Sequence, residues 1–294
     1  MNDLPIIPLY HVERLIAEGG TAKVYRGIDL RSGYLVAIKE LKIRHFKNQI
    51  IRNKFKEVEA QMYLYMRHPN IPKLVDFIDL QERGLLYIIM EFIEGRTLEQ
   101  YIYREIGLIP EEKALQLFLE ILDTVAYLHN VKIPALNING ILHLDIKSNN
   151  IMLQPNGKIK LIDLGIASRM SEASDNTGFG TPAYMPPEQS EMGKYGRYTD
   201  VFALGIMLFE MLTGTLPFNS QNPNARQANE EIKHKIKYNP TPKMKQFYPK
   251  INPDLQFIVE RALAKNPAGR YQSCEEFQNV IKNYMSYRAK LRYG

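Results

Sequence analysis

The chain has 294 residues, a formal net charge of +6 and a single cysteine, Cys274. At about 150 residues per domain, this length predicts two compact bodies. The 45% hydrophobic and 24% charged residues exclude intrinsic disorder and a coiled coil, and one cysteine excludes a disulfide framework and a multi-thiolate metal site. The excess of Lys and Arg favours anionic partners, and the scarcity of cysteine indicates a reducing compartment such as the cytoplasm.

The first ninety or so residues have the pattern of a small antiparallel sheet with one helix. Short β-prone runs cover residues 9–16 and 24–29, and residues 34–40 follow a Ser-Gly turn. Residues 51–67 repeat apolar side chains at steps of three and four, which predicts a helix packed on the sheet. Two more strands are expected at 73–79 and 85–92. Residues 1–92 are therefore expected to form one domain.

From residue 93 onward the pattern is mainly helical. Helices are predicted at 97–106, 110–129, 199–212, 229–236, 253–264 and 274–288. The Asn-Gly of residues 156–157 predicts a hairpin between strands at 150–153 and 158–162. The apolar run 201–218 contains Glu210 and is too short for a bilayer, so it is interpreted as a buried core helix. Residues 130–139 show no clear period and are interpreted as a loop within a second domain, 93–294.

Residues 17–24, AEGGTAKV, combine small side chains with a position between two strands. A hairpin of this composition can lie close over a phosphate chain, because few Cβ atoms keep its backbone amides away. A glycine-containing hairpin without a ligand explains the segment equally well when it is taken alone.

Lys39 ends the apolar strand VAIK and so places a charge beside core positions. A buried lysine needs an acidic partner or a polyanion. The helix at 51–67 offers Glu57 and Glu59, and the helical period places Glu59 on the core-facing side. We therefore expect Lys39 to pair with Glu59.

The segments ILHLDIKSNNIML (141–153) and LIDLG (161–165) deliver several polar groups to one end of a predicted hairpin. Together with the features above, and in the same order along the chain, they resemble the catalytic domain of eukaryotic-type (Hanks-type) serine/threonine protein kinases. The double glycine and the PPEQ stretch resemble bacterial members more than animal ones. The resemblance covers nearly the whole chain.

This resemblance implies an α+β, two-lobed protein kinase fold, with a small sheet lobe, a larger helical lobe and an ATP cleft between them. The implied activity is ATP-dependent phosphoryl transfer to serine and threonine hydroxyls of protein substrates in signalling, with autophosphorylation. The implied cofactors are ATP and Mg²⁺, with Mn²⁺ as an alternative, and no nucleic-acid partner is expected.

The resemblance also assigns roles, residue by residue. Asp145 is expected to orient the attacking hydroxyl, Lys147 to steady the γ-phosphate, and Lys39, held by Glu59, to grip the α- and β-phosphates. The expected metal ligands are Asn150 and Asp163. The expected nucleotide-binding residues are Ile16, Gly19, Gly20, Val24, Ala37, Lys39, Met90, Glu91, Ile93 and Met152. Ser171, Ser174, Thr177 and Thr181 belong to the expected activation segment, and Glu188, Asp200 and Arg270 are expected to be structural.

Some positions depart from the family pattern. Ala17 and Ala22 replace the first and third loop glycines, which predicts a stiffer loop with weaker phosphate contact. Leu144 replaces the usual arginine that neutralises a phosphate on the activation segment. We therefore expect that phosphorylation of the activation segment does not activate this chain through a phosphate contact at position 144, unless another cation takes the place of the arginine.

Two other functions fit parts of the sequence. One is a pseudokinase scaffold that binds nucleotide without turnover, although every charged catalytic position is present. The other is a small-molecule kinase, although GTPAYMPPE (180–188) and its partner Arg270 favour a polypeptide acceptor. Basic clusters at 42–56, 233–245 and 288–292 are interpreted mainly as solvated faces. The last cluster suggests a membrane only through a segment not in this chain.

Overall fold

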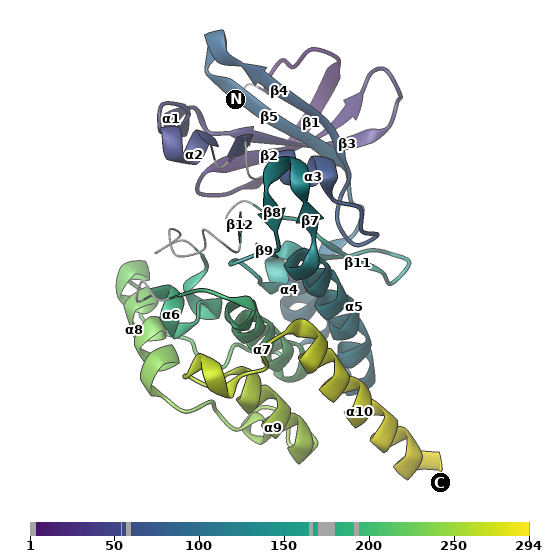
Figure 1. Ribbon diagram of the computed structural model, residues 1–294, viewed down its shortest axis with the longest axis vertical. Coiled ribbons are helices and arrows are strands. Elements are labelled where there is room, and N and C mark those ends of the chain that lie inside the picture. The colour runs from purple at the N-terminus through teal and green to yellow at the C-terminus, as the bar shows by residue number, and fades with distance from the viewer. Residues whose placement is uncertain are drawn as a thin grey trace. The chain divides into compact units, whose positions relative to one another are not determined.

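The computed structural model describes residues 4–53, 55–56, 60–164, 167–169, 180–190 and 194–293. The chain divides into two compact units, Met1–Gly95 and Arg96–Gly294. The first is built on an antiparallel sheet and the second is mainly helical (Figure 1), which confirms the expected α+β class. The boundary expected between residues 92 and 93 stays a prediction.

The first unit contains a five-stranded antiparallel sheet with the strand order β1-β2-β3-β5-β4. Its strands are β1 (Tyr10–Glu18), β2 (Ala22–Asp29), β3 (Leu35–Leu41), β4 (Leu74–Leu80) and β5 (Leu85–Glu91). Each expected strand is present, with ends shifted by a few residues. The last two strands are joined by the short 3-10 helix η2 (Gln81–Arg83) and by Gly84. The φ of Gly84 is 64°, in the left-handed region that glycine adopts without strain.

The register of this sheet separates its two faces, because directly opposed residues of antiparallel strands point to the same side. Tyr25 opposes Ile38, which opposes Ile89, and all three belong to one buried cluster. On the other face, Val24 opposes Lys39. Ala37 lies on that same face, two residues before Lys39 in β3. Val24, Ala37 and Lys39, three of the residues expected to bind nucleotide, therefore share the face opposite this cluster.

The helix expected at 51–67 is only partly described. The structure contains α1 (Ile43–Phe46), α2 (Gln49–Asn53) and α3 (Gln61–Tyr65), whereas residues 54 and 57–59 lie outside the described residues. Phe55, Met62 and Met66 are buried as the helical period predicts, while Tyr65 is 42% exposed. The apolar face of this region thus packs inward.

The second unit is organised around α7 (Arg197–Thr213), which contacts α5, α9 and α10 (Figure 1). Every residue of α7 from Thr199 to Thr213 is buried, so the expected core helix is confirmed. The longer helices around it are α5 (Glu111–Asn130), α8 (Ala225–Tyr238), α9 (Pro253–Ala262) and α10 (Cys274–Tyr293). The shorter ones are α4 (Leu98–Gln100), η3 (Tyr101–Ile106, a π-helical turn), η4 (Pro134–Leu136), η5 (Ser148–Asn150), η7 (Pro182–Tyr184), α6 (Pro187–Ser190), η8 (Met244–Gln246) and η9 (Pro267–Gly269).

Short strands frame the polar segment of the second unit. β10 (Ile151–Leu153) pairs with β11 (Ile159–Leu161), as the Asn-Gly turn predicts, and also with β6 (Arg96–Thr97). β9 (Ile141–Leu142) pairs with β12 (Ser168–Arg169). Residues 143–150, which carry His143, Asp145, Lys147 and Asn150, therefore lie between two short strand pairs.

The prediction of a loop at 130–139 was wrong, because this stretch forms a hairpin. β7 (Lys132–Ile133) pairs with β8 (Ile138–Asn139), and Ile133 and Ile138 are buried. Asn137 turns the chain with a φ of 52°, a conformation that asparagine tolerates. Strands of two residues are too short to show a period in sequence.

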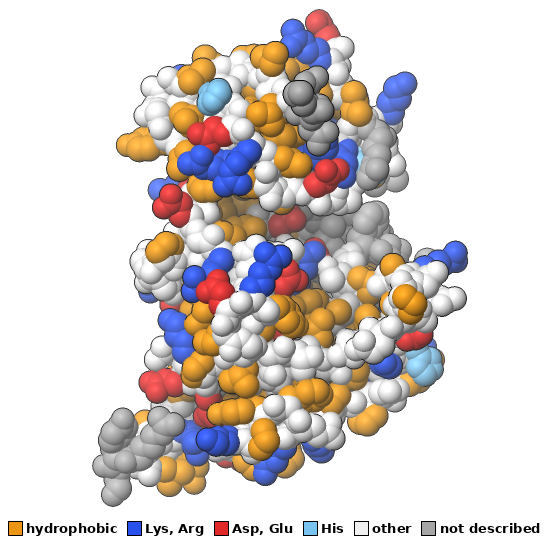
Figure 2. Space-filling view, turned by 180° about the vertical axis from the view of Figure 1, so that it is seen from behind, with side chains coloured by type: hydrophobic (Ala, Val, Ile, Leu, Met, Phe, Trp, Pro, Cys, Tyr) orange, Lys and Arg blue, Asp and Glu red, His pale blue; other side chains and the backbone are white. Residues whose placement is uncertain are grey.

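The surface is mixed in character. On the face that Figure 2 shows, hydrophobic side chains are interspersed with charged ones in both units. Among the described residues, no helix is long and apolar enough to cross a membrane.

Candidate active site

Asp145 lies at the centre of the hydrogen-bond network between β9 and β10. Its Oδ1 accepts hydrogen bonds from the backbone N of Thr181 at 3.0 Å and from Thr181 Oγ1 at 2.8 Å. Its Oδ2 is 2.7 Å from Lys147 Nζ. Both carboxylate oxygens therefore have fixed positions in the site.

Lys147 joins the same group from the other side. Its Nζ donates to Thr181 Oγ1 at 2.8 Å as well as to Asp145. Asp145 and Thr181 lie 36 residues apart in sequence. They are joined by a direct hydrogen bond and through the ammonium group of Lys147. The structure brings these three predicted site residues together.

Asn150 is a buried member of the network. Its Nδ2 donates to the backbone O of Asp145 at 2.9 Å, which leaves the amide Oδ1 as an oxygen ligand. The backbone O of Asn150 accepts from Ile162 N at 2.9 Å, so Asp163 directly follows a residue that is hydrogen-bonded to Asn150. An amide and a carboxylate oxygen suit a hard divalent cation such as Mg²⁺. Among the described residues, no group of three or more His, Cys, Asp or Glu gathers as a metal site.

Asp200 on α7 anchors the segment that carries Asp145. Its Oδ2 accepts from the backbone N of His143 at 2.8 Å and from His129 Nε2 at 2.8 Å, and its Oδ1 accepts from Leu144 N at 2.9 Å. Burial opposes ionisation of this carboxyl, but the hydrogen bond and charge of His129 outweigh it and lower its pKa. A fully buried carboxylate thus fixes the backbone just before Asp145.

His143 is fully buried beside this anchor. Its Nδ1 accepts a hydrogen bond from the backbone N of Asp145 at 3.3 Å. Burial lowers the pKa of its imidazole against the raising effect of Asp200. Among the described residues, no group hydrogen-bonds its Nε2.

Leu144 occupies the position where the family pattern has arginine. Its side chain is buried in a small cluster with Leu142 and Tyr195. Its backbone has a φ of 65°, and its O accepts from Gln189 Nε2 at 3.0 Å. Position 144 therefore contributes a buried apolar side chain and no cation.

Glu188 and Arg270 form a bidentate ion pair, as expected. Arg270 Nη1 and Nη2 lie 2.7 and 2.9 Å from the two carboxylate oxygens of Glu188. Arg270 is 1% exposed and also donates to the backbone O of Ala264 and Lys265. This pair ties the segment after Thr181 to the turn that precedes α10.

Glu210 takes part in a polar group that the sequence did not reveal as such. The Oγ of Ser148 donates to Glu210 Oε1 at 3.1 Å, and the hydroxyl of Tyr184 donates to Oε2. Burial raises the pKa of Glu210 to about 7, although hydrogen bonds from Tyr184, Tyr103 and Ser148 act in the opposite direction. The available signal was a lone carboxylate inside an apolar helical run.

The predicted nucleotide residues of the first unit lie mainly on one face of its sheet. Lys39 is buried, with its Nζ 6.0 Å from the ring centroid of Phe55. Met90 opposes Ala37 across the β3–β5 pair and therefore lies on the same face as Lys39. Glu59, the expected partner of Lys39, lies outside the described residues.

The loop between β1 and β2 is a tight turn. The backbone N of Gly19 donates to the O of Ala22 at 2.9 Å, and a Cβ built on Gly20 would meet no atom within 4 Å. Ile16 lies at the irregularity between Leu15 and Ala17. The tip is therefore open enough for a ligand to approach its backbone.

The remaining expected nucleotide residues are divided between the two units. Glu91 ends β5 and donates its backbone N to Lys73 O at 2.9 Å, and Ile93 is buried two residues further on. Met152 lies in β10 of the second unit, opposite Thr97. The expected phosphorylation positions Ser171, Ser174 and Thr177 lie outside the described residues.

Comparison with known proteins identifies relatives of this chain. The family model of the protein kinase domain matches residues 10–282. The chain is 34% identical over 276 residues to the serine/threonine-protein kinase PrkC of Bacillus subtilis, covering 93% of this chain and 40% of that protein. It is 34% identical over 279 residues to the probable serine/threonine-protein kinase PknB of Lactococcus lactis, covering 92% and 41%. It is 29% identical over 276 residues to the serine/threonine-protein kinase PknB of Mycobacterium tuberculosis, covering 92% and 42%. The chain thus spans about two fifths of the length of these relatives.

Proposed function

Because the chain belongs to the protein kinase family, we propose that it transfers the γ-phosphoryl group of ATP to serine and threonine hydroxyls of protein substrates, including its own. The family implies ATP, a divalent metal ion and a protein acceptor. The relatives compared above are named as serine/threonine kinases, which supports this choice of acceptor.

The observation that carries the proposal is the arrangement of Asp145, Lys147 and Thr181 within hydrogen-bond distance of one another. Phosphoryl transfer requires mainly that groups be positioned and phosphate oxygens neutralised. Asp145 supplies an acceptor that orients the attacking hydroxyl. Lys147, held next to it, supplies the cation for the γ-phosphate.

Thr181 supports a hydroxyl acceptor of the serine and threonine type. Its two hydrogen bonds to Asp145 attach the segment expected to receive the substrate directly to the residue expected to act on it. The Glu188–Arg270 pair fixes the far end of that segment. A substrate hydroxyl arriving along the segment would therefore meet Asp145.

The nucleotide is proposed to contact both units, which correspond to the lobes expected at 1–92 and 93–294. Val24, Ala37 and Met90 would cover the adenine from one sheet face, with Met152 on its other side. Ile16, Gly19 and Gly20 would cover the phosphates, Lys39 with Glu59 would hold them, and backbone groups of Glu91 and Ile93 would meet the adenine edge. When bound by Asn150 and Asp163, Mg²⁺, or Mn²⁺ in its place, would neutralise phosphate oxygens.

A cytoplasmic location is proposed from the single, buried Cys274, whose pKa is raised chiefly by burial and which fits a reducing compartment. Attachment to a membrane is proposed only through a segment outside this sequence.

The test is incubation of the purified chain with γ-labelled ATP, MgCl₂ and a generic protein substrate, followed by mapping of modified residues. We expect label on serine and threonine in the substrate and in the chain itself. Label on tyrosine alone, or only on small molecules, would contradict the proposal.

The variant Asp163→Asn separates a kinase from a nucleotide-binding scaffold. It removes one expected metal ligand while keeping the size of the side chain. A kinase should lose phosphoryl transfer in this variant, whereas a scaffold would show none in the wild type either. Exposed Asp123 on α5 offers a matched Asp→Asn control that should keep its activity.

A further inference from the structure

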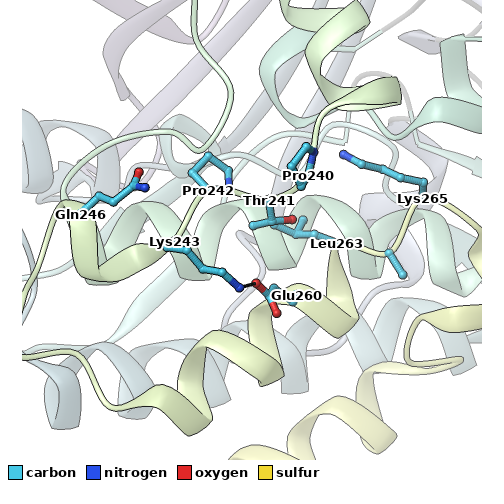
Figure 3. A pocket seen from close by; sticks show the side chains of 9 residues that line it. Pro240, Thr241, Pro242, Lys243, Gln246, Glu260, Leu263 and Lys265 are labelled. Atoms are coloured by element: carbon cyan, nitrogen blue, oxygen red, sulfur yellow. Dashed lines mark hydrogen bonds and ion pairs between the residues drawn. The ribbon is translucent and has the colours of Figure 1, made fainter.

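The segment that follows α8 and the residues at the C-terminal end of α9 line an open pocket of about 450 Å³ (Figure 3). Pro240 and Pro242 form one wall, and Leu263 and Ala264 contribute from the residues that directly follow α9. Figure 3 shows Lys265 reaching toward Pro240, and Lys243 joined to Glu260. The pocket lies wholly within the second unit, and none of its lining residues belongs to the proposed active site.

Hydrogen bonds from two side chains hold the pocket together. Gln256 on α9 accepts from Met244 N at 2.6 Å and donates to the backbone O of Pro242 at 3.3 Å. From the opposite side, Lys265 donates to the backbone O of Ile236 on α8. The pocket is therefore bounded by segments that are fixed to neighbouring helices.

Charge inside the pocket is unevenly compensated. Glu260 is matched by Lys243 at 2.8 Å and also accepts from Gln256 at 2.7 Å. Lys265 Nζ lies 4.3 Å from the ring centroid of Phe218 and forms no ion pair with a carboxylate among the described residues. Burial, and then the neighbouring Arg270, lower the pKa of Lys265 to about 8. An anion placed beside Lys265 would relieve this uncompensated charge.

The surface around the pocket has the same sign. Residues 233–250 contain six lysines and no acidic residue. Lys233 and Lys243 are paired within the chain, but Lys245 and Lys250 are exposed and form no ion pair with a described carboxylate. Tyr238, which is 61% exposed, lies just before the proline wall and adds apolar surface.

We propose that this pocket is a docking site for an acidic linear peptide segment of a protein substrate, with a carboxylate on Lys265 and an apolar side chain against the proline wall. The substrate role rests on the proposed kinase function, whereas peptide binding does not. Charge complementarity selects the occupant, because a neutral apolar peptide would leave Lys265 uncompensated and an acidic one would not. A volume of about 450 Å³ suits a few side chains rather than a broad polyanion.

The test measures fluorescence anisotropy of a labelled short peptide that has glutamates on both sides of a leucine. A matched peptide carries glutamine in place of each glutamate. We expect the acidic peptide to bind the full chain about tenfold more tightly than its neutral match, with an affinity that falls as salt rises. Equal binding of both peptides, or binding of neither, would overturn the proposal.

Two variants separate the pocket from its surroundings. Lys265→Gln removes the internal charge, and Thr241→Tyr fills the pocket without changing charge. Each should weaken binding of the acidic peptide about tenfold. Lys290→Gln, on the exposed face of α10, removes the same charge elsewhere and should change binding less than about twofold. If Lys290→Gln weakens binding as much as Lys265→Gln does, binding is diffuse electrostatics and the pocket is not the site.

Folding and catalysis are checked on the same samples. Thermal unfolding identifies a variant that loses binding by losing its fold, and Thr241→Tyr then decides, since it leaves Lys265 in place. A single-stranded oligonucleotide serves as a second probe. If it binds the wild type and Thr241→Tyr alike while the acidic peptide binds neither, the basic surface binds polyanions and the docking proposal is overturned. Phosphoryl transfer without peptide binding would contradict the docking site alone, and peptide binding without transfer would contradict the kinase function alone.

Discussion

At the scale of single residues, Asp145 is held on both carboxylate oxygens by donors from two different segments. Thr181 fixes Oδ1 and Lys147 fixes Oδ2. A carboxylate oriented in this way needs no rearrangement to accept a hydrogen bond from an incoming hydroxyl, which is what preorganisation requires.

Asp145→Asn should lower phosphoryl transfer by roughly 10²–10⁴-fold, because a neutral amide oxygen is a weaker acceptor than a carboxylate and cannot take up the hydroxyl proton, and the new NH₂ would face existing donors. Nucleotide affinity should change only a few-fold, since Asp145 is not expected to contact ATP. The measurement is kcat/KM with labelled ATP alongside titration with a non-hydrolysable analogue. Activity close to that of an Asp123→Asn control would show that Asp145 is not the acceptor.

Leu144 determines a second prediction at this scale. Its apolar side chain packs with Leu142 and Tyr195, so this position carries no positive charge. A phosphate on Ser171, Ser174 or Thr177 would therefore find no charge at this position to bind. Phosphatase-treated chain should keep most of its activity when transfer is measured before it can modify itself again.

The structural part of this prediction uses two substitutions at the same position. Leu144→Arg buries an unpaired charge and should lower the free energy of unfolding by at least about 2 kcal/mol. Leu144→Met conserves volume and should cost less than about 1.5 kcal/mol. Dephosphorylated protein that stays inactive until one of the three hydroxyls is modified would contradict the functional part.

At the scale of elements, α7 shows what the sequence could and could not predict. Its burial follows from an apolar run, and the structure confirms it. The partners of Glu210 could not be predicted, because Ser148 and Tyr184 lie 62 and 26 residues away and only the fold brings them together. A lone charge in such a run signals a polar partner without naming it.

The hairpin formed by β7 and β8 was missed for a different reason. Its strands have two residues each, so neither alternation nor a helical period appears. The helix at 51–67 was better defined in sequence, since its apolar period correctly placed Phe55 and Met62 inside. Period is thus informative only where an element spans several repeats.

Glu210 should make stability depend on pH. Its folded pKa of about 7 exceeds the ordinary 4.5, so the folded chain binds this proton more tightly than the unfolded chain does. The free energy of unfolding must then fall as pH rises between these values, by at most about 3 kcal/mol. Glu210→Gln imitates the protonated form and should remove this part of the pH dependence in urea unfolding measured between about pH 5 and pH 8.

The control for this measurement is Glu112→Gln, a change of an exposed carboxylate in the first turn of α5. Its unfolding profile should keep the wild-type slope. A Glu210→Gln profile parallel to wild type throughout would mean that Glu210 is ionised at no extra cost, and that the three hydroxyls around it fully offset its burial.

At the scale of the whole molecule, the residues proposed to bind nucleotide come from both compact units, Met1–Gly95 and Arg96–Gly294. The sequence assigned site residues only by their order, which matches that of the protein kinase family, and their roles stay a prediction. It could not predict how Asp145 is satisfied, since Thr181 comes from a segment 36 residues away. The pairing of Lys39 with Glu59 stays a prediction, because Glu59 lies outside the described residues.

Nucleotide binding tests whether the two units act together, because Lys39 belongs to the first unit and Asp163 to the second. If one nucleotide contacts both, Lys39→Met and Asp163→Asn should each weaken binding of a non-hydrolysable ATP analogue by about tenfold or more in isothermal titration with MgCl₂, since each removes a charge-assisted contact. Their effects should also couple, so the double variant should lose less than the product of the single losses. Lys290→Met, which changes an exposed lysine on α10, should bind like wild type. Full affinity in either site variant would place the nucleotide on one unit alone and would leave the other without its expected role.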